Sequence, residues 1–165
     1  MSQRHPQIRE VVIANEVLLP TIIALLNEGK TVTLRLRGIS MRPFLEDNRD
    51  CAVLRKSTDP KLWEPVLAEL PNKRFVFHRI VKIEGDHVTL RGDGNIGVEH
   101  CKLSDIKAQT VGFYRKDRKK LETLDSWKWK AYSCLWTRTL PLRPYILAID
   151  RRLNRLMAKL KRNNK

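Results

Sequence analysis

The sequence predicts a mainly β protein of the α+β class, with a coiled, mostly antiparallel β domain between two helical segments. Residues 31–116 contain several short segments in which apolar and polar side chains alternate, separated by turn residues, as is typical of half-buried strands. Apolar residues at helical spacing occur instead in residues 1–30 and 117–165. We therefore expect an N-terminal helical segment, a β domain and a basic, amphipathic helical tail with these bounds.

Composition supports a folded chain with an unusual charge. With 165 residues, of which 42% are hydrophobic, the chain is long enough for one domain with appendages and a substantial core. Its 33 Lys and Arg against 18 Asp and Glu give a formal net charge of +15, which indicates an anionic partner or a basic tail. The cysteines, Cys51, Cys101 and Cys134, are odd in number and unpatterned, and no signal peptide is recognised, so we expect a cytoplasmic location.

The N-terminal segment is expected to form one helix or two between residues 8 and 28. Pro20 would kink this helix or open the second one, and Gly29 would end it. Asn15, Glu16 and Pro20 interrupt the apolar run, which therefore lacks the ~20 uninterrupted apolar residues of a membrane span. We expect this segment to pack against the core.

The first strand leads to a candidate nucleophile. Residues 32–37 alternate with a period of two, and Gly38 breaks the alternation shortly before Ser40. Gly38 allows a sharp turn and Pro43 restricts the backbone, so Ser40 is expected on a short, rigid connection. An ordinary strand-to-loop turn would show the same pattern, so these residues alone do not separate the two interpretations.

A second strand carries a candidate base. His78 lies in the alternating segment 75–83, and Arg79 should point to the opposite face, where we expect it to be structural or to contact substrate. Turn residues lead from there to Asp93, so serine, histidine and aspartate follow one another at the ends of β segments. The other expected strands are 51–55, 63–70, 88–91 and 106–115.

Three short segments around these residues carry a family resemblance. They are Gly38-Ile39-Ser40-Met41-Arg42-Pro43, His78-Arg79-Ile80-Val81 and Arg91-Gly92-Asp93-Gly94-Asn95. In this order they resemble the three boxes of the superfamily that joins type I signal peptidases with self-cleaving LexA-type repressors. The resemblance covers residues 31–116. It implies the coiled β domain of that superfamily and a serine endopeptidase that prefers small residues before the scissile bond.

The resemblance also implies catalytic roles. The LexA branch and most bacterial signal peptidases use a lysine as general base, whereas the matching position here is His78, as in the endoplasmic-reticulum and archaeal branch. Ser40 would then be the nucleophile and Asp93 the supporting carboxylate. Glu99 is the nearest match to a second acidic residue of that branch. We expect neither the transmembrane anchor of signal peptidases nor the DNA-binding domain of the repressors, and in this the sequence would depart from the family.

The chemistry of these residue types agrees with such roles. An imidazole can take the proton of a serine hydroxyl at neutral pH, and a carboxylate can hold the ring in the required tautomer. Backbone N–H groups of the turn at Gly38 and Ile39 are the expected oxyanion hole. By proximity to Ser40, the expected substrate-binding residues are Met41, Pro43 and Phe44.

No metal or other cofactor is expected. His78, His87, His100 and Cys101 lie close in sequence, but their spacings match neither paired Cys-x-x-Cys nor His-Glu-x-x-His. His87 and His100 are expected at the surface or in hairpins.

The tail leaves two interpretations open. The charge run 115–120 ends the β domain, Ser126 is placed to cap a short helix, and a second helix from about Tyr145 has a basic face. Its apolar stripe consists of Ile146, Ile149, Leu153, Leu156, Met157 and Leu160. Either this hairpin packs on the body with its charges in water, or residues 126–163 contact an anionic membrane peripherally, at the inner face. No motif for specific nucleic-acid binding is recognisable.

The sequence therefore predicts a serine endopeptidase that cleaves a peptide bond in an extended segment of a protein or leader peptide. Two alternatives remain: a catalytically silent peptide-binding or regulatory module on the same scaffold, and a basic protein that binds membranes or nucleic acid. If His78 is not the base, the lysines to test are Lys73, Lys82 and Lys102.

Overall fold

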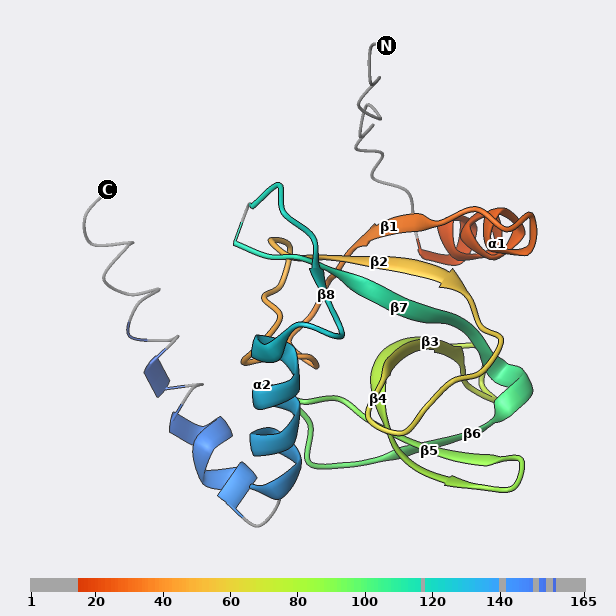
Figure 1. Ribbon diagram of the computed structural model, residues 1–165. Helices are drawn as coiled ribbons and strands as arrows, with labels where there is room; N and C mark the ends of the chain where they lie inside the picture. The colour runs from red at the N-terminus through yellow and green to blue at the C-terminus, as the bar shows by residue number, and fades with distance from the viewer. Residues whose placement is uncertain (1–14, 117, 140–141, 150–151, 154–155, 157–165) are drawn as a thin grey trace.

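The computed structural model describes residues 15–116, 118–139, 142–149, 152–153 and 156 (Figure 1). It confirms a mainly β, α+β architecture, in which eight strands are accompanied by helices. The elements are α1 (Asn15–Asn27), β1 (Val32–Arg35), β2 (Cys51–Lys56), β3 (Pro65–Glu69), β4 (Phe75–Glu84), β5 (His87–Arg91), β6 (Glu99–Lys102), the 3-10 turn η1 (Leu103–Asp105), β7 (Ile106–Tyr114), β8 (Glu122–Thr123) and α2 (Trp127–Arg138).

The strands form one curled sheet in the order β1-β2-β7-β3-β4-β5-β6, and β8 pairs with β7. Every strand pair is antiparallel. Figure 1 shows α1 beside β1 and β2 and α2 at the other end of the sheet, next to β8. Register shifts interrupt three of the pairings, and such bulges increase the local twist and bend of a sheet.

The expected strands are present, with ends that differ by a few residues, but β6 and β8 were not predicted as strands. In β6 only Cys101 is buried, while His100 and Lys102 are exposed. Such a short, polar strand at the edge of the sheet has no apolar alternation that a sequence pattern can detect. The strand that was not predicted, β6, begins at Glu99 and therefore positions one of the expected site residues.

Two hydrophobic clusters hold these elements together. One cluster lies between α1, α2 and the sheet, and includes Leu26, Leu54, Phe113 and Trp129. The other is formed by β3, β4, β5, β6 and β7, with Val66, Ile80, Val88, Leu90 and Ile106 among its members. α1 contributes Leu19, Ile22 and Leu26 to the first cluster, so the expectation that this helix packs against the core is confirmed for its described part.

α2 belongs to the same core as the sheet. Ser126 caps it as expected, because its Oγ accepts a hydrogen bond from the Trp129 N–H at 3.3 Å. Trp129 and Trp136 are buried, and Trp129 packs against Phe44 and Phe113 with ring centroids 4.9 and 5.0 Å apart. The tail thus starts as part of the folded body, because α2 packs on the sheet.

In the ranges that the structure describes, no helix has both the length and the apolar character needed to cross a bilayer.

Candidate active site

The loop after β1 holds Ser40 in a defined position. Gly38 has φ +91°, in the left-handed region that glycine adopts without strain, and its N–H donates to Asp47 Oδ1 at 2.7 Å. The Ser40 carbonyl accepts a hydrogen bond from the Gly94 N–H at 2.7 Å, and the Ser40 residue itself is half-buried. The serine loop is therefore bound directly to the segment that contains Asp93.

Gly92 and Gly94 allow this close approach. A Cβ added at Gly92 would lie 2.5 Å from the Ser40 carbonyl oxygen and 3.0 Å from His78 Nε2, and one added at Gly94 would overlap the Ile39 carbonyl oxygen. Because the Ser40 carbonyl oxygen and His78 Nε2 both lie this close to the same position at Gly92, the two atoms are themselves only a few ångströms apart. The Nε2 edge of the imidazole therefore faces the Ser40 loop across Gly92.

His78 lies on β4 and is bound by Glu99 from β6. Its Nδ1 is 2.6 Å from Glu99 Oε2, although β5 separates the two strands. β5 ends at Arg91, which pairs with Arg79, so the same register continued by one residue sets Gly92 opposite His78. Glu99 pairs with Leu90 on β5, and its carboxylate extends past the end of β5 to the imidazole.

The contact with Glu99 determines which nitrogen of His78 carries the proton. An ionised carboxylate only accepts hydrogen bonds, so Nδ1–H donates to Glu99 and Nε2 has the free lone pair. Burial lowers the pKa of His78 below its ordinary value, while the Glu99 carboxylate opposes this shift. A neutral imidazole at pH 7 with Nε2 facing the serine loop is the state that a general base requires.

Asp93 lies on the other side of β4 and binds Arg79. The guanidinium donates to both carboxylate oxygens, with Nε 2.9 Å from Oδ1 and Nη2 2.7 Å from Oδ2. The Tyr132 hydroxyl donates to Oδ2 at 2.8 Å, and Trp136 Nε1 donates to the Asp93 carbonyl at 3.2 Å. Asp93 was expected to support His78, but in the structure the carboxylate hydrogen-bonded to His78 is that of Glu99.

Arg79 and Tyr132 form a buried polar cluster with Asp93, in which their polar groups are hydrogen-bonded. Burial works against the charged guanidinium, but the hydrogen bonds and charge of Asp93 outweigh it and raise the pKa of Arg79. Burial, followed by the Asp93 charge, raises the pKa of the Tyr132 hydroxyl well above its ordinary value, so the hydroxyl stays a donor. Arg79 also donates to the Trp63 carbonyl and to Ser133 Oγ. Its expected structural role agrees with these contacts.

Ser40, His78 and Glu99 line one pocket of about 240 Å³. Met41 lies in its wall, as expected of a substrate-binding residue, and Asn95 adds an amide beside Ser40 and His78. The remaining lining residues are Leu36, Arg37, Gly38, Leu45, Glu46, Arg74, Phe75, Val76 and Phe77. The wall is thus apolar in part, with charged groups among it.

Other expected site residues have different surroundings. Phe44 is buried in the core, with its ring stacked on Tyr132 at 4.4 Å between centroids, and it does not line this pocket. Pro43 is exposed and lies outside the lining as well. The Gly38 N–H donates its hydrogen bond to Asp47. The other backbone donors of this turn that could form an oxyanion hole are the N–H groups of Ile39, which is exposed, and of Ser40.

Asn95 and Arg74 line the pocket but were not predicted as site residues. In the sequence, Asn95 stood out only as the last residue of the segment Arg91-Gly92-Asp93-Gly94-Asn95. Arg74 lies in the connection that leads into β4, and its Nη2 is 3.3 Å from Glu99 Oε1. The three alternative lysines are exposed and absent from the pocket lining, and Lys73 and Lys82 form ion pairs with Glu69 and Glu84.

His87 and His100 are at the surface, as expected. Within the described part of the chain, no three His, Cys, Asp or Glu side chains are grouped so that they could hold a metal ion.

A scan against protein-family models and a search of curated proteins both found no match to this chain.

Proposed function

We propose that the protein is a serine endopeptidase with the coiled β domain of the LexA and signal-peptidase superfamily. Ser40 is the nucleophile, His78 the general base and Glu99 the carboxylate that orients the base. The observation that carries the proposal is the contact of His78 Nδ1 with Glu99 at 2.6 Å, while Nε2 faces the Ser40 loop in one pocket. The order hydroxyl, imidazole, carboxylate is the order found in catalytic triads, where a carboxylate orients the base that activates the nucleophile.

In the proposed reaction, His78 Nε2 takes the Ser40 hydroxyl proton as Oγ attacks the carbonyl carbon of the scissile peptide bond. Glu99 stabilises the imidazolium through Nδ1–H. The Ser40 N–H and the Asn95 amide, which both belong to residues that line the pocket, are the proposed donors to the oxyanion. His78 then gives its proton to the leaving amine, and water, deprotonated by the same imidazole, hydrolyses the acyl-enzyme and restores Ser40.

In this proposal Asp93 acts through the backbone. Its side chain is held by Arg79 and Tyr132, and the next residue, Gly94, donates its N–H to the Ser40 carbonyl. Asp93 therefore positions the serine loop relative to the base without touching the base.

A serine-directed fluorophosphonate probe tests the proposal. The protein should form a covalent adduct at Ser40, seen by mass spectrometry, and Ser40→Ala should abolish it and lower peptide turnover by at least about 10³-fold. Ser104→Ala, which changes an exposed serine on η1, is the matched control and should label normally.

Labelling of Ser40→Ala equal to that of the unchanged protein would refute the assignment of the nucleophile. Saturable binding of extended peptides without adduct formation or turnover would instead support the peptide-binding module.

A further inference from the structure

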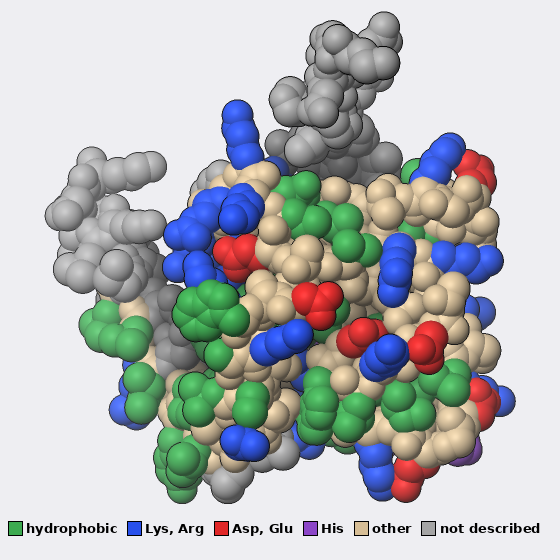
Figure 2. Space-filling model, viewed as in Figure 1, with side chains coloured by type: hydrophobic (Ala, Val, Ile, Leu, Met, Phe, Trp, Pro, Cys, Tyr) green, Lys and Arg blue, Asp and Glu red, His purple; other side chains and the backbone are tan. Residues whose placement is uncertain are grey.

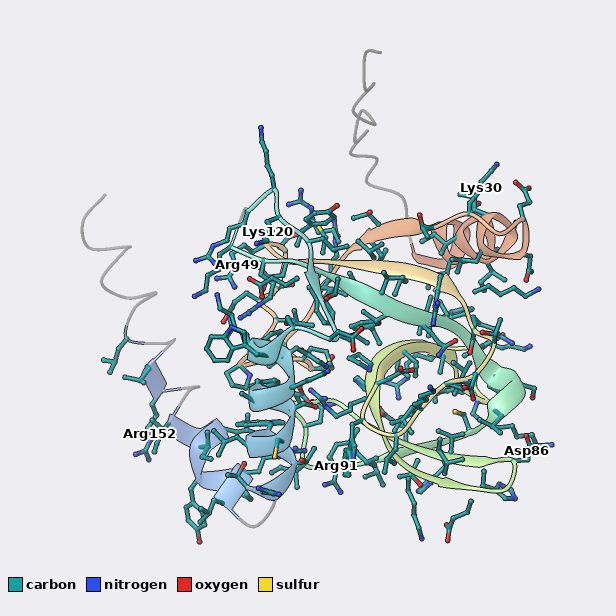
Figure 3. All side chains as sticks on the ribbon, viewed as in Figure 1. Lys30, Arg49, Asp86, Arg91, Lys120 and Arg152 are labelled. Atoms are coloured by element: carbon teal, nitrogen blue, oxygen red, sulfur yellow. The ribbon has the colours of Figure 1, made fainter. Side chains whose placement is uncertain are left out.

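Positive charge is concentrated in the tail and in the loop that precedes it. Residues 126–165 contain eleven Lys or Arg and a single Asp. In the loop between β7 and β8 the exposed basic residues are Lys116, Arg118, Lys119 and Lys120. Figure 2 shows Lys and Arg side chains gathered over this loop, next to hydrophobic ones, and Figure 3 shows Lys120 and Arg49 at the same corner of the molecule.

The exposed side of α2 carries large apolar side chains next to the basic residues Lys128, Lys130 and Arg138. Trp127 is 75% exposed and Leu135 66%, and both lie on one helical face with Ala131. The opposite face of α2 carries Trp129 and Trp136 into the core. The exposed tryptophan is thus not needed for packing the helix on the body.

The following helical residues continue this apolar surface. Residues 143–149 are helical, and Arg143 joins them to α2, with its guanidinium 5.1 Å from the centre of the Trp136 ring and Nη2 3.3 Å from the Trp136 carbonyl. Of the described members of the apolar stripe, Ile146 is half-buried, whereas Ile149, Leu153 and Leu156 are exposed, as are Leu142 and Tyr145. Met157 and Leu160 lie outside the described residues.

We propose that this surface docks on an anionic lipid bilayer. The docking surface consists of the basic β7–β8 loop, the outer face of α2 and the exposed apolar residues of 142–156. Tryptophan, aliphatic side chains and neighbouring Lys and Arg match the three layers of such a bilayer, because indole favours the headgroup region, aliphatic groups enter the acyl boundary and cations bind anionic headgroups.

The charge and the exposed apolar side chains of the docking surface favour a bilayer over a second copy of the chain or a nucleic acid. A second copy would bring two strongly basic tails together, which like-charge repulsion opposes. A nucleic acid would neutralise the lysines and arginines but would leave the leucines and isoleucine in water. The proposal concerns where the protein is located and is independent of the peptidase proposal.

Vesicle co-sedimentation tests the proposal. The full chain should pellet with phosphatidylcholine vesicles that contain phosphatidylglycerol, should not pellet with phosphatidylcholine alone, and should be released by salt. The emission of Trp127 should shift to the blue on binding, and Trp127→Phe should lose the greater part of this shift.

Two variants separate the charged from the apolar contribution. Lys119→Glu with Lys120→Glu should weaken the apparent affinity by at least about tenfold, and Trp127→Ser with Leu135→Ser should weaken it to a similar degree. Lys82→Glu with Lys102→Glu makes the same charge change near the β4–β5 hairpin and should bind about as the unchanged protein does. All the substituted side chains are exposed, and circular dichroism checks that each variant folds.

Three outcomes would overturn the proposal. They are equal binding to neutral and anionic vesicles, equal weakening by the Lys82 and Lys102 control, and binding to an oligonucleotide under salt conditions in which vesicles do not bind. A concentration-dependent dimer that Trp127→Ser with Leu135→Ser abolishes, without vesicle binding, would assign the surface to a second copy.

Discussion

On each side of β4 a basic side chain is hydrogen-bonded to a carboxylate, but the two contacts have different surroundings. His78 and Arg79 are neighbours that point to opposite faces, and each binds a carboxylate from the segment that follows β5. The Arg79–Asp93 pair is 1% exposed on both sides, whereas the Glu99 side chain is 21% exposed and lines the pocket. One pair is closed to water, and the other borders an opening.

Under the peptidase proposal, this difference assigns the Glu99 carboxylate to the reaction and the Asp93 carboxylate to the fold. A charged pair in the interior must have every donor and acceptor satisfied, and Asp93 and Arg79 reach this with the Tyr132 hydroxyl and the Trp63 carbonyl. A general base needs a free lone pair and access for substrate, and His78 has both on its Nε2 side.

Glu99→Gln should lower kcat/KM by about 10²- to 10⁴-fold with little change in unfolding free energy, because the imidazolium loses its negative partner. The acid limb of kcat/KM should lie below pH 6.5, since burial lowers the pKa of His78 and activity needs the neutral ring. Glu99 raises that pKa, so its loss should move the limb to still lower pH.

Glu84→Gln, which also alters an ion-paired carboxylate on this part of the sheet, is the control for that measurement. A fall in rate without movement of the acid limb would make Glu99 a packing residue and would remove the distinction between the two sides of β4.

Asp93→Asn should act on stability. It leaves the Arg79 guanidinium buried without its counter-charge, and the unfolding free energy should fall by about 3–5 kcal/mol in chemical denaturation. On the folded fraction, kcat/KM should change far less than in Glu99→Gln. The double variant Arg79→Met with Asp93→Leu should be less destabilised than the sum of its single changes, because no charge is left unpaired.

If Asp93→Asn instead kept full stability and lost turnover with a shifted acid limb, Asp93 would be the partner of the base after all.

Tyr132→Phe should have the smallest effect. It removes one hydrogen bond to the Asp93 carboxylate, which is expected to cost about 1.5–3 kcal/mol of unfolding free energy. Tyr145→Phe, at a tyrosine that is 71% exposed, is the matched control and should be neutral in the same thermal or chemical unfolding measurement. Equal stability of both variants would mean that α2 contributes only apolar contacts at this point.

Local patterns predicted the strand of His78, the turn at Ser40 and the opposite orientation of His78 and Arg79. They did not predict which carboxylate reaches which face. That choice depends on the end of β5 and on β6, whose four residues have no apolar alternation. The place of Glu99 was indicated only by a likeness to a family motif, and Tyr132, which binds Asp93 together with Arg79, comes from the distant α2.

The prediction for the tail was limited in the same way, because a pattern within one segment does not show what that segment contacts. Helical periodicity predicted an apolar stripe, but it could not show whether a neighbouring surface covers the stripe. In the structure Arg143 and Leu147 are buried, while described members of the stripe remain exposed. Contact between helices depends on the loop between them and on the shape of the body, neither of which a single-segment pattern contains.

The close approach at Gly92 and Gly94 has a consequence for judging activity in other proteins that share these boxes. Both glycines are required by the contact between two loops, which a protein without any turnover would need equally. Retention of the Gly-Asp-Gly-Asn run in a homologue would thus report shape alone. The joint presence of the hydroxyl, the imidazole and the acid seven positions beyond Gly92 would be the informative criterion.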